Sequence, residues 1–114
     1  MEIALFQNGI FKDEFYAIEI KDRAIRSGSN YVYLTLPEYK IARSLVDSGY
    51  DGYSLYDIPQ IICKDSNYRS ICIVRTHISN IKRKLSIIGR GRIEVTLELP
   101  TMRYYITRGL SPAT

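Results

Sequence analysis

Cysteine and histidine, the residues that hold most structural zinc ions, are scarce in this chain. Its 114 residues include two cysteines, Cys63 and Cys72, and a single histidine. A structural zinc site needs about four such ligands, so the sequence excludes one. We expect both cysteines to be reduced thiols that fill space.

Long apolar runs are also missing. No run of apolar residues reaches the roughly 18 needed to cross a membrane. Residues 1–8 place no basic segment ahead of an apolar stretch, as a signal peptide would. We therefore expect no membrane partner and a cytoplasmic location. The length of the chain suits a single domain.

The sequence lacks patterns typical of catalysis. The glycines of residues 89–92 have no flanking strand and helix of the kind that a phosphate-binding loop requires. No carboxylates are spaced for general acid–base work, and His77 has no matched partners for a triad. We expect no enzymatic activity, no cofactor, no metal and no small-molecule substrate.

Acidic residues are absent from one long window, residues 66–93. This window carries seven basic residues: Arg69, Arg75, Lys82, Arg83, Lys84, Arg90 and Arg92. The net charge of the whole chain is +4, so the window carries +7 and the rest carries −3. Such one-sided charge is typical of a protein that meets a polyanion, although a solvated basic helix would look the same.

The first third of the chain favours a small antiparallel sheet. Segments rich in Ile, Tyr, Val and Phe predict strands at residues 3–6, 16–20, 24–26 and 31–34. Asn8-Gly9 predicts a tight turn and residues 27–30 predict a hairpin loop.

Two helices are expected in the middle of the chain. Residues 35–38 form a Thr-x-x-Glu capping box, apolar residues follow at helical spacing, and Gly49 is a natural stop. A second start lies at Ser54. Pro59 is too deep for that start, so this helix should begin near Asp57 or bend at its beginning.

The clearest pattern predicts a third helix over residues 69–85. Five apolar residues fall on one stripe: Ile71, Val74, Ile78, Ile81 and Leu85. The opposite side presents Arg69, Cys72, Ile73, Thr76, Asn80 and Arg83. Alternation over 93–99 and 102–106 then predicts a terminal hairpin, followed by a loose tail at 107–114.

Two segments resemble OmpR/PhoB-type DNA-binding domains. Residues 34–39, Leu-Thr-Leu-Pro-Glu-Tyr, are similar to the opening of that family's first helix. Residues 74–85 resemble its recognition helix, commonly Val-Asp-Val-His-Ile-x-x-Leu-Arg-x-Lys-Leu, and Ser54 and Ile58 match the second helix more weakly. The resemblance spans 16–106. It implies an α+β fold: a winged helix-turn-helix with an N-terminal antiparallel sheet, three helices and a C-terminal β-hairpin wing. Residues 1–15 would be an extension that can add a strand.

The chain departs from that family at several positions. Residues 99–104 replace the Arg-Gly-x-Gly-Tyr wing, and Cys63 replaces the tryptophan that ends the second helix. Cys72 stands at a basic position, and Ser79 and Asn80 stand where the family has two arginines. About 15 residues precede the domain, so we expect no phosphorylatable receiver within the chain.

A basic helix of this kind fits the major groove of DNA, where base edges carry distinct patterns of donors and acceptors. We expect base contacts from Thr76, Asn80, Ser79, Ile73 and Cys72, and phosphate contacts from Arg69, Arg75, His77, Lys82, Arg83 and Lys84. The resemblance adds Tyr104, in the hairpin, as a contact to the DNA backbone. All these residue types are equally ordinary on a solvated helix.

Two functions follow. In the first, the chain is a sequence-specific regulator of transcription, with residues 69–85 in the major groove and the hairpin 93–106 as the wing. The resemblance implies a head-to-tail homodimer on double-stranded DNA, a loop at 64–67 that touches RNA polymerase, and a bacterial, phage or plasmid origin. The alternative is a winged-helix module that binds another regulator or the polymerase, which the missing wing arginine and the apolar Ile73 and Cys72 motivate.

Overall fold

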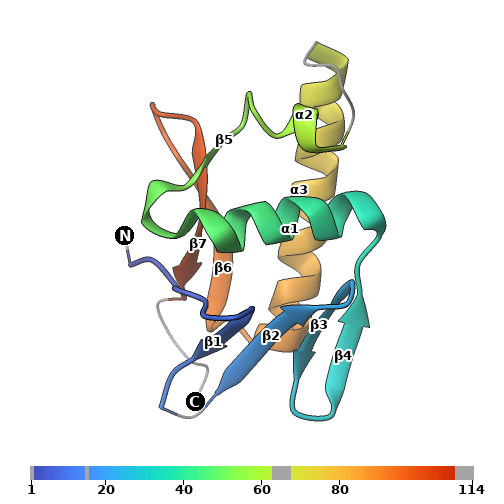
Figure 1. Ribbon diagram of the computed structural model, residues 1–114. Coiled ribbons are helices and arrows are strands. Elements are labelled where there is room, and N and C mark those ends of the chain that lie inside the picture. Colours follow the sequence, from blue (N-terminus) through green and yellow to red (C-terminus); the bar gives the residue numbers. More distant parts are fainter. Residues whose placement is uncertain (1, 15, 63–67, 110–114) are drawn as a thin grey trace.

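The computed structural model describes residues 2–14, 16–62 and 68–109, with only the backbone described for 68–70. The elements, in order, are β1 (Ile10–Lys12), β2 (Ala17–Lys21), β3 (Ala24–Ser27), β4 (Asn30–Tyr33), α1 (Leu36–Ser48), the 3-10 turn η1 (Gly49–Asp51), β5 (Tyr53–Ser54), α2 (Pro59–Ile62), α3 (Tyr68–Gly89), β6 (Ile93–Glu98) and β7 (Arg103–Arg108). The predicted α+β class is confirmed: an antiparallel sheet is followed by helices and a C-terminal hairpin (Figure 1).

The N-terminal sheet has the strand order β1-β2-β3-β4, and every neighbouring pair is antiparallel. The strands predicted at 16–20, 24–26 and 31–34 are confirmed to within a residue at each end. Ser27 pairs with Asn30, so the predicted hairpin loop is a tight two-residue turn. Asp22 and Arg23 form a second tight turn, with φ of 55° and 60°.

The strand predicted at residues 3–6 is wrong. This segment makes one bridge, Ile3 to Thr107, and one neighbouring hydrogen bond from Ala4 N to Ile106 O of 2.9 Å. β6 pairs along the whole of β7, and β5 occupies the start of its other edge. Only the last part of that edge remains for the N-terminal segment, which is too short for a strand. The first strand is β1, reached through the predicted Asn8-Gly9 turn.

α1 begins where the capping box predicts. Thr35 N donates to Glu38 Oε1 over 3.0 Å, and Glu38 N donates to Thr35 Oγ1 over 3.4 Å. Gly49 ends the helix with φ of 51°, a backbone conformation that glycine adopts without strain. The buried face of α1 carries Ile41, Ala42, Leu45 and Val46.

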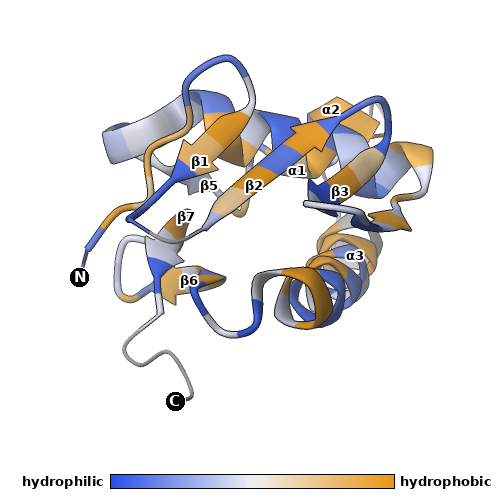
Figure 2. Cartoon of the chain, turned by 90° about the horizontal axis from the view of Figure 1, so that it is seen from below, coloured by the Kyte–Doolittle hydropathy of each residue, from blue (hydrophilic) through white to orange (hydrophobic). Residues whose placement is uncertain are grey.

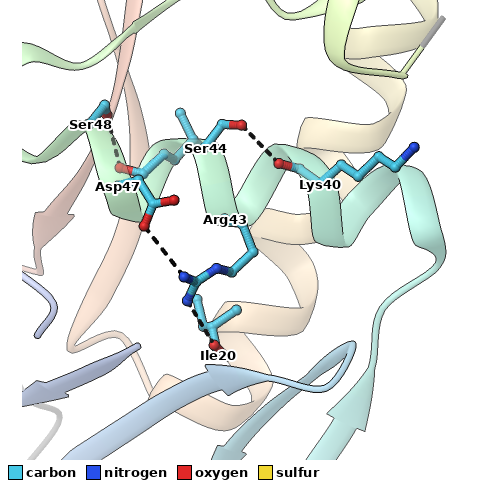
Figure 3. Close-up of polar contacts among 7 residues, drawn as sticks. Ile20, Lys40, Arg43, Ser44, Asp47 and Ser48 are labelled. Atoms are coloured by element: carbon cyan, nitrogen blue, oxygen red, sulfur yellow. Dashed lines mark hydrogen bonds and ion pairs between the residues drawn. The ribbon is translucent and has the colours of Figure 1, made fainter. Parts of the chain in front are cut away.

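Arg43 ties α1 to the sheet beneath it. Its guanidinium donates to Ile20 O of β2 over 3.4 Å and to the Asp47 carboxylate of the next turn over 3.5 Å (Figure 3). The helix therefore lies across the sheet, as Figure 1 shows, and its apolar side closes over the buried side chains of β2 and β3.

α2 begins later than either predicted start. Ser54 accepts hydrogen bonds at its side chain from Tyr56 N and at its carbonyl from Asp57 N, so it closes a turn and does not cap a helix. The helix starts at Pro59. A proline lacks the N–H that the first helical position leaves unpaired, so this place suits it.

α3 is the longest element, and its burial pattern confirms the stripe that the spacing of apolar residues predicts. Val74, Ile78, Ile81 and Leu85 are buried and Ile71 is half-buried, as predicted. The helix runs to Gly89, four residues beyond the predicted end, and Ile88 continues the buried stripe. Figure 2, which views the molecule from below, shows α3 beside β3 with hydrophobic and hydrophilic residues alternating around its turns.

The hairpin β6–β7 also extends beyond its prediction. β7 ends at Arg108, and Thr107 is buried with its hydroxyl 2.7 Å from that of Thr96. The expected tail at 107–114 is therefore wrong for its first two residues, because Thr107 and Arg108 pair with Glu94 and Ile93 across the hairpin. Residues 110–114 lie outside the described part of the chain.

Residues 2–14 belong to the same packed unit as the other described residues. Ala4 and Phe11 lie in the hydrophobic core. Asp13 forms an ion pair of 3.1 Å with Arg92, and the Arg92 guanidinium lies over the ring of Tyr16. Of the helices in the described ranges, none combines the length and apolarity needed to cross a membrane.

The burial of Phe11 makes the contribution of the N-terminal segment measurable. We expect Phe11→Ala to lower the free energy of unfolding by about 3–5 kcal/mol, because it leaves a cavity under β1. The matched control is Lys12→Ala at the next, exposed position, with an effect within about 0.5 kcal/mol. Urea unfolding followed by circular dichroism measures both; equal midpoints would show that β1 is not part of the core.

Candidate nucleic-acid interface

The predicted contact residues of 72–84 all lie on α3. Cys72, Ile73, Arg75, Thr76, Ser79, Lys82 and Arg83 are exposed, and His77, Asn80 and Lys84 are half-buried. Because the helix is continuous and its apolar stripe is buried, residues three or four apart such as Thr76, Asn80 and Arg83 share the face opposite the core. Arg69 and Cys63 are not among the described side chains.

The exposed face of α3 is positively charged and free of acids. Within the described part of the chain, no carboxylate forms an ion pair with Arg75, Lys82, Arg83 or Arg90. α3 and the turn after it contain no acidic residue. Arg75, Lys82 and Arg83 lie on α3 and Arg90 directly follows it; all four are exposed and available to an outside anion.

Lys84 is an exception among the basic residues. Its ammonium lies 2.5 Å from Glu38 Oε1, and the two side chains are 16% and 3% exposed. Burial would raise the pKa of Glu38, but hydrogen bonds from Lys84 and Thr35 and the charges of Lys84 and His77 outweigh it and lower that pKa. The charge of Lys84 therefore balances a buried carboxylate, and it does not fit the predicted phosphate contact.

Tyr104 does not fit its predicted role either. It is 4% exposed, and burial raises its pKa while the nearby charge of Arg75 opposes that rise. β7 is the middle strand of the sheet β5-β7-β6, and residues 104–107 are buried in succession. With so little exposed surface, Tyr104 does not fit the expected contact with the DNA backbone.

Two of the predicted base contacts have a different chemical character from that expected. Thr76 Oγ1 donates to Cys72 O over 3.2 Å, which leaves its methyl group and its acceptor lone pair for a ligand. Cys72 is a free thiol, as expected, but it is exposed and therefore fills no space in the core. Ile73, 44% exposed, presents an apolar surface beside it.

Sequence reasoning missed Ile87 and Ser86 because it ended the helix too early. Ile87 is 63% exposed and continues the outer face of Ile73 and Asn80 at spacings of seven residues. Ser86 lines a groove between α3 and β6 together with Lys82 and residues 93–97. Extending the periodicity beyond Leu85 to Ile88 would have found both.

No model of a known protein family matches the chain, and no curated protein matches its sequence.

The structural role of Lys84 separates it from its neighbour Lys82. We expect Lys84→Met to lower the free energy of unfolding by about 3 kcal/mol, because it leaves Glu38 buried without its cation. The control Lys82→Met, on the exposed side of the same helix, should change it by less than about 0.5 kcal/mol. Thermal or urea unfolding at pH 7 measures both, and equal stabilities would contradict a structural role for Lys84.

Proposed function

We propose that this chain is a winged-helix protein that binds double-stranded DNA through α3 and regulates transcription. The observation that carries the proposal is the exposed surface of α3 and the turn after it: among the described residues, Arg75, Lys82, Arg83 and Arg90 form no ion pair, and this stretch contains no acid. DNA presents a dense line of phosphates, so a surface of this kind gains affinity by releasing the counterions that they hold.

The arrangement around α3 supports a major-groove contact. An α-helix fits the major groove, and α3 presents its outer face while its apolar stripe is packed on the rest of the fold. The order sheet, α1, α2, α3, hairpin is also the order that the OmpR/PhoB-type resemblance implies, with β6–β7 in the place of the wing.

The contacts divide by chemistry. Asn80 can pair with both N6 and N7 of adenine, and the methyl groups of Thr76 and Ile73 suit the methyl of thymine. Ser79 and Cys72 lie on the same exposed part of the helix. The phosphate contacts proposed here are Arg75, His77, Lys82 and Arg83, with Arg69 kept as an expectation from the sequence. Lys84 and Tyr104 are not among the proposed contacts, because Lys84 is bound to Glu38 and Tyr104 is buried.

The resemblance to OmpR/PhoB-type domains also implies how copies of the chain would be arranged on DNA. A head-to-tail pair of copies would bind two half-sites in direct repeat, in the cytoplasm of a bacterium or on the DNA of its phage or plasmid. Residues 64–67, through which the polymerase would be touched, lie outside the described part of the chain.

A second candidate function is a contact with another protein through the same helix. Ile73 and Ile87 favour it, because they place exposed apolar surface at 44% and 63% on the face proposed for DNA. An apolar protein interface would depend little on salt, whereas phosphate contacts depend on it steeply. The two candidates therefore differ in one measurable quantity.

The salt dependence of binding tests the phosphate contacts. We expect the affinity for a labelled duplex to fall steeply between 50 and 200 mM salt, by roughly 0.9 log units per phosphate contact for each tenfold rise. Lys82→Ala should weaken binding to all sequences alike and reduce this slope by about one contact. Lys12→Ala, on β1, is the control and should leave the slope unchanged. Fluorescence anisotropy measures both, and a flat slope for the parent chain would favour the protein-binding candidate.

Selection from random duplexes tests the base contact of Asn80. The parent chain should enrich a short motif, and Asn80→Ala should lose about 1–3 kcal/mol of affinity and relax the preference at a single base position. Ser86→Ala, further along the helix, should keep the motif. A motif that survives Asn80→Ala at full strength would place Asn80 away from the bases.

A further inference from the structure

The tip of the hairpin β6–β7 is apolar and projects into solvent. Leu99 is 67% exposed, and Pro100 and Thr101 beside it are exposed as well. Leu99 is the most exposed large aliphatic side chain of the described residues. Leu99 and Pro100 together place two adjacent apolar side chains at the exposed end of the hairpin.

The tip is also held in one shape. Met102 N donates to Glu98 O over 2.8 Å and closes the turn. The Thr101 hydroxyl donates to the carbonyl and the carboxylate of Glu98 over 3.3 and 3.0 Å. Leu55 N donates to Met102 O over 2.9 Å, which ties the tip to the segment before α2. Leu99 and Pro100 therefore protrude from an ordered support.

This tip lies at the same end of the molecule as α2 and the beginning of α3 (Figure 1). One groove is lined by Lys82 and Ser86 of α3 and by residues 93–97 of β6, so the strand that leads to the tip starts beside the helix. Arg75 of α3 is close enough to act on Tyr104, which pairs with Leu97, two residues before Leu99. A duplex that lies along α3 and extends over β6 and β7 would meet the tip.

No cation is present at the tip to grip the DNA backbone. Residues 97–102 contain no lysine or arginine. The nearest arginine, Arg103, turns its guanidinium to the carbonyls of Asp51 and Gly52 over 2.9 and 3.4 Å. The tip therefore has no cation for a phosphate, and its most exposed side chains are those of Leu99 and its neighbours Pro100 and Thr101.

We propose that Leu99 and Pro100 form an apolar wedge that enters the minor groove beside the helix-bound major groove and unstacks one base-pair step. Side chains of this kind open base steps from the minor groove and bend the duplex toward the major groove. Pyrimidine–purine steps unstack most easily, so the wedge would select a TA or CA/TG step at a fixed distance from the bases that α3 contacts. This inference rests on the proposed DNA binding.

Glu98 gives the wedge a second, electrostatic signature. Its carboxylate is part of the tip and, within the described residues, forms no ion pair. If the tip enters the groove, this charge faces the phosphates on either side, and Glu98→Gln should strengthen binding a few-fold at low salt. If the tip stays clear of the DNA, the same substitution should have no effect.

The test measures DNA bending and affinity separately. A duplex carrying a donor and an acceptor dye at its two ends reports the bend by energy transfer, and anisotropy on the same duplex reports the affinity. The duplex contains the selected motif or, without a motif, a set of TA steps in varied positions. The parent chain should bend it by about 20–90°. Leu99→Ala should reduce the bend by more than half and weaken binding by less than about tenfold, since the contacts of α3 remain. Leu5→Ala, which truncates an exposed leucine of the N-terminal segment, is the control.

Each result bears on the inference. Bending lost in Leu99→Ala, with binding retained and Glu98→Gln tighter, supports the wedge. A parent chain that binds without bending, or a Leu99→Ala variant that bends equally, overturns the wedge and leaves the DNA-binding proposal standing. A parent chain that binds no duplex at 50 mM salt overturns both. Leu99 is exposed, so its truncation should leave the unfolding midpoint unchanged, which is verified on the same samples.

Discussion

The apolar stripe of α3 is the constraint on which the other elements depend. Val74, Ile81 and Leu85 are almost fully buried, and they lie in one core with side chains of the sheet, α1 and the hairpin. One helix thus meets all the layers of the fold. Its rotation about its own axis is set by that packing, and the same rotation decides which residues remain outside. The proposed function is therefore a consequence of the core: the face with the unpaired cations is the face that the described residues leave exposed.

Charge follows the same division between inside and outside. Lys82 and Lys84 are two residues apart, yet one points into solvent and the other is bound to a buried carboxylate. Glu38 completes the capping box of α1, and its carboxylate also neutralises the charge of Lys84 of α3. A buried carboxylate without a cation would destabilise the fold. The ion pair avoids this cost and joins the start of α1 to the second half of α3. Because Lys84 is used in this way, its charge is not available to DNA.

In the hairpin, buried and exposed apolar residues lie within a few positions of one another. Tyr104 and Ile106 are buried because their side chains belong to the hydrophobic core, whereas Leu99 and Pro100 project beyond the last paired residues. The tip carries these aliphatic side chains on a turn that is closed by hydrogen bonds. If the hairpin contacts DNA, shape and deformability of the duplex become the properties that it reads.

Local signals in the sequence determined much of the architecture. The capping box, Gly49 and the 3–4 spacing of α3 depend on neighbours within about two turns, so they can be interpreted from the order of residues alone. The exposed positions of Thr76, Ser79 and Arg83 follow from the same spacing. The tertiary structure alone decided the rest: that Glu38 takes Lys84 from 46 positions away, that β5 leaves residues 3–6 too little of β7 for a strand, and that Tyr104 is covered on a middle strand. Each of these outcomes depends on which segments become neighbours in space, and that is settled only when the whole core packs.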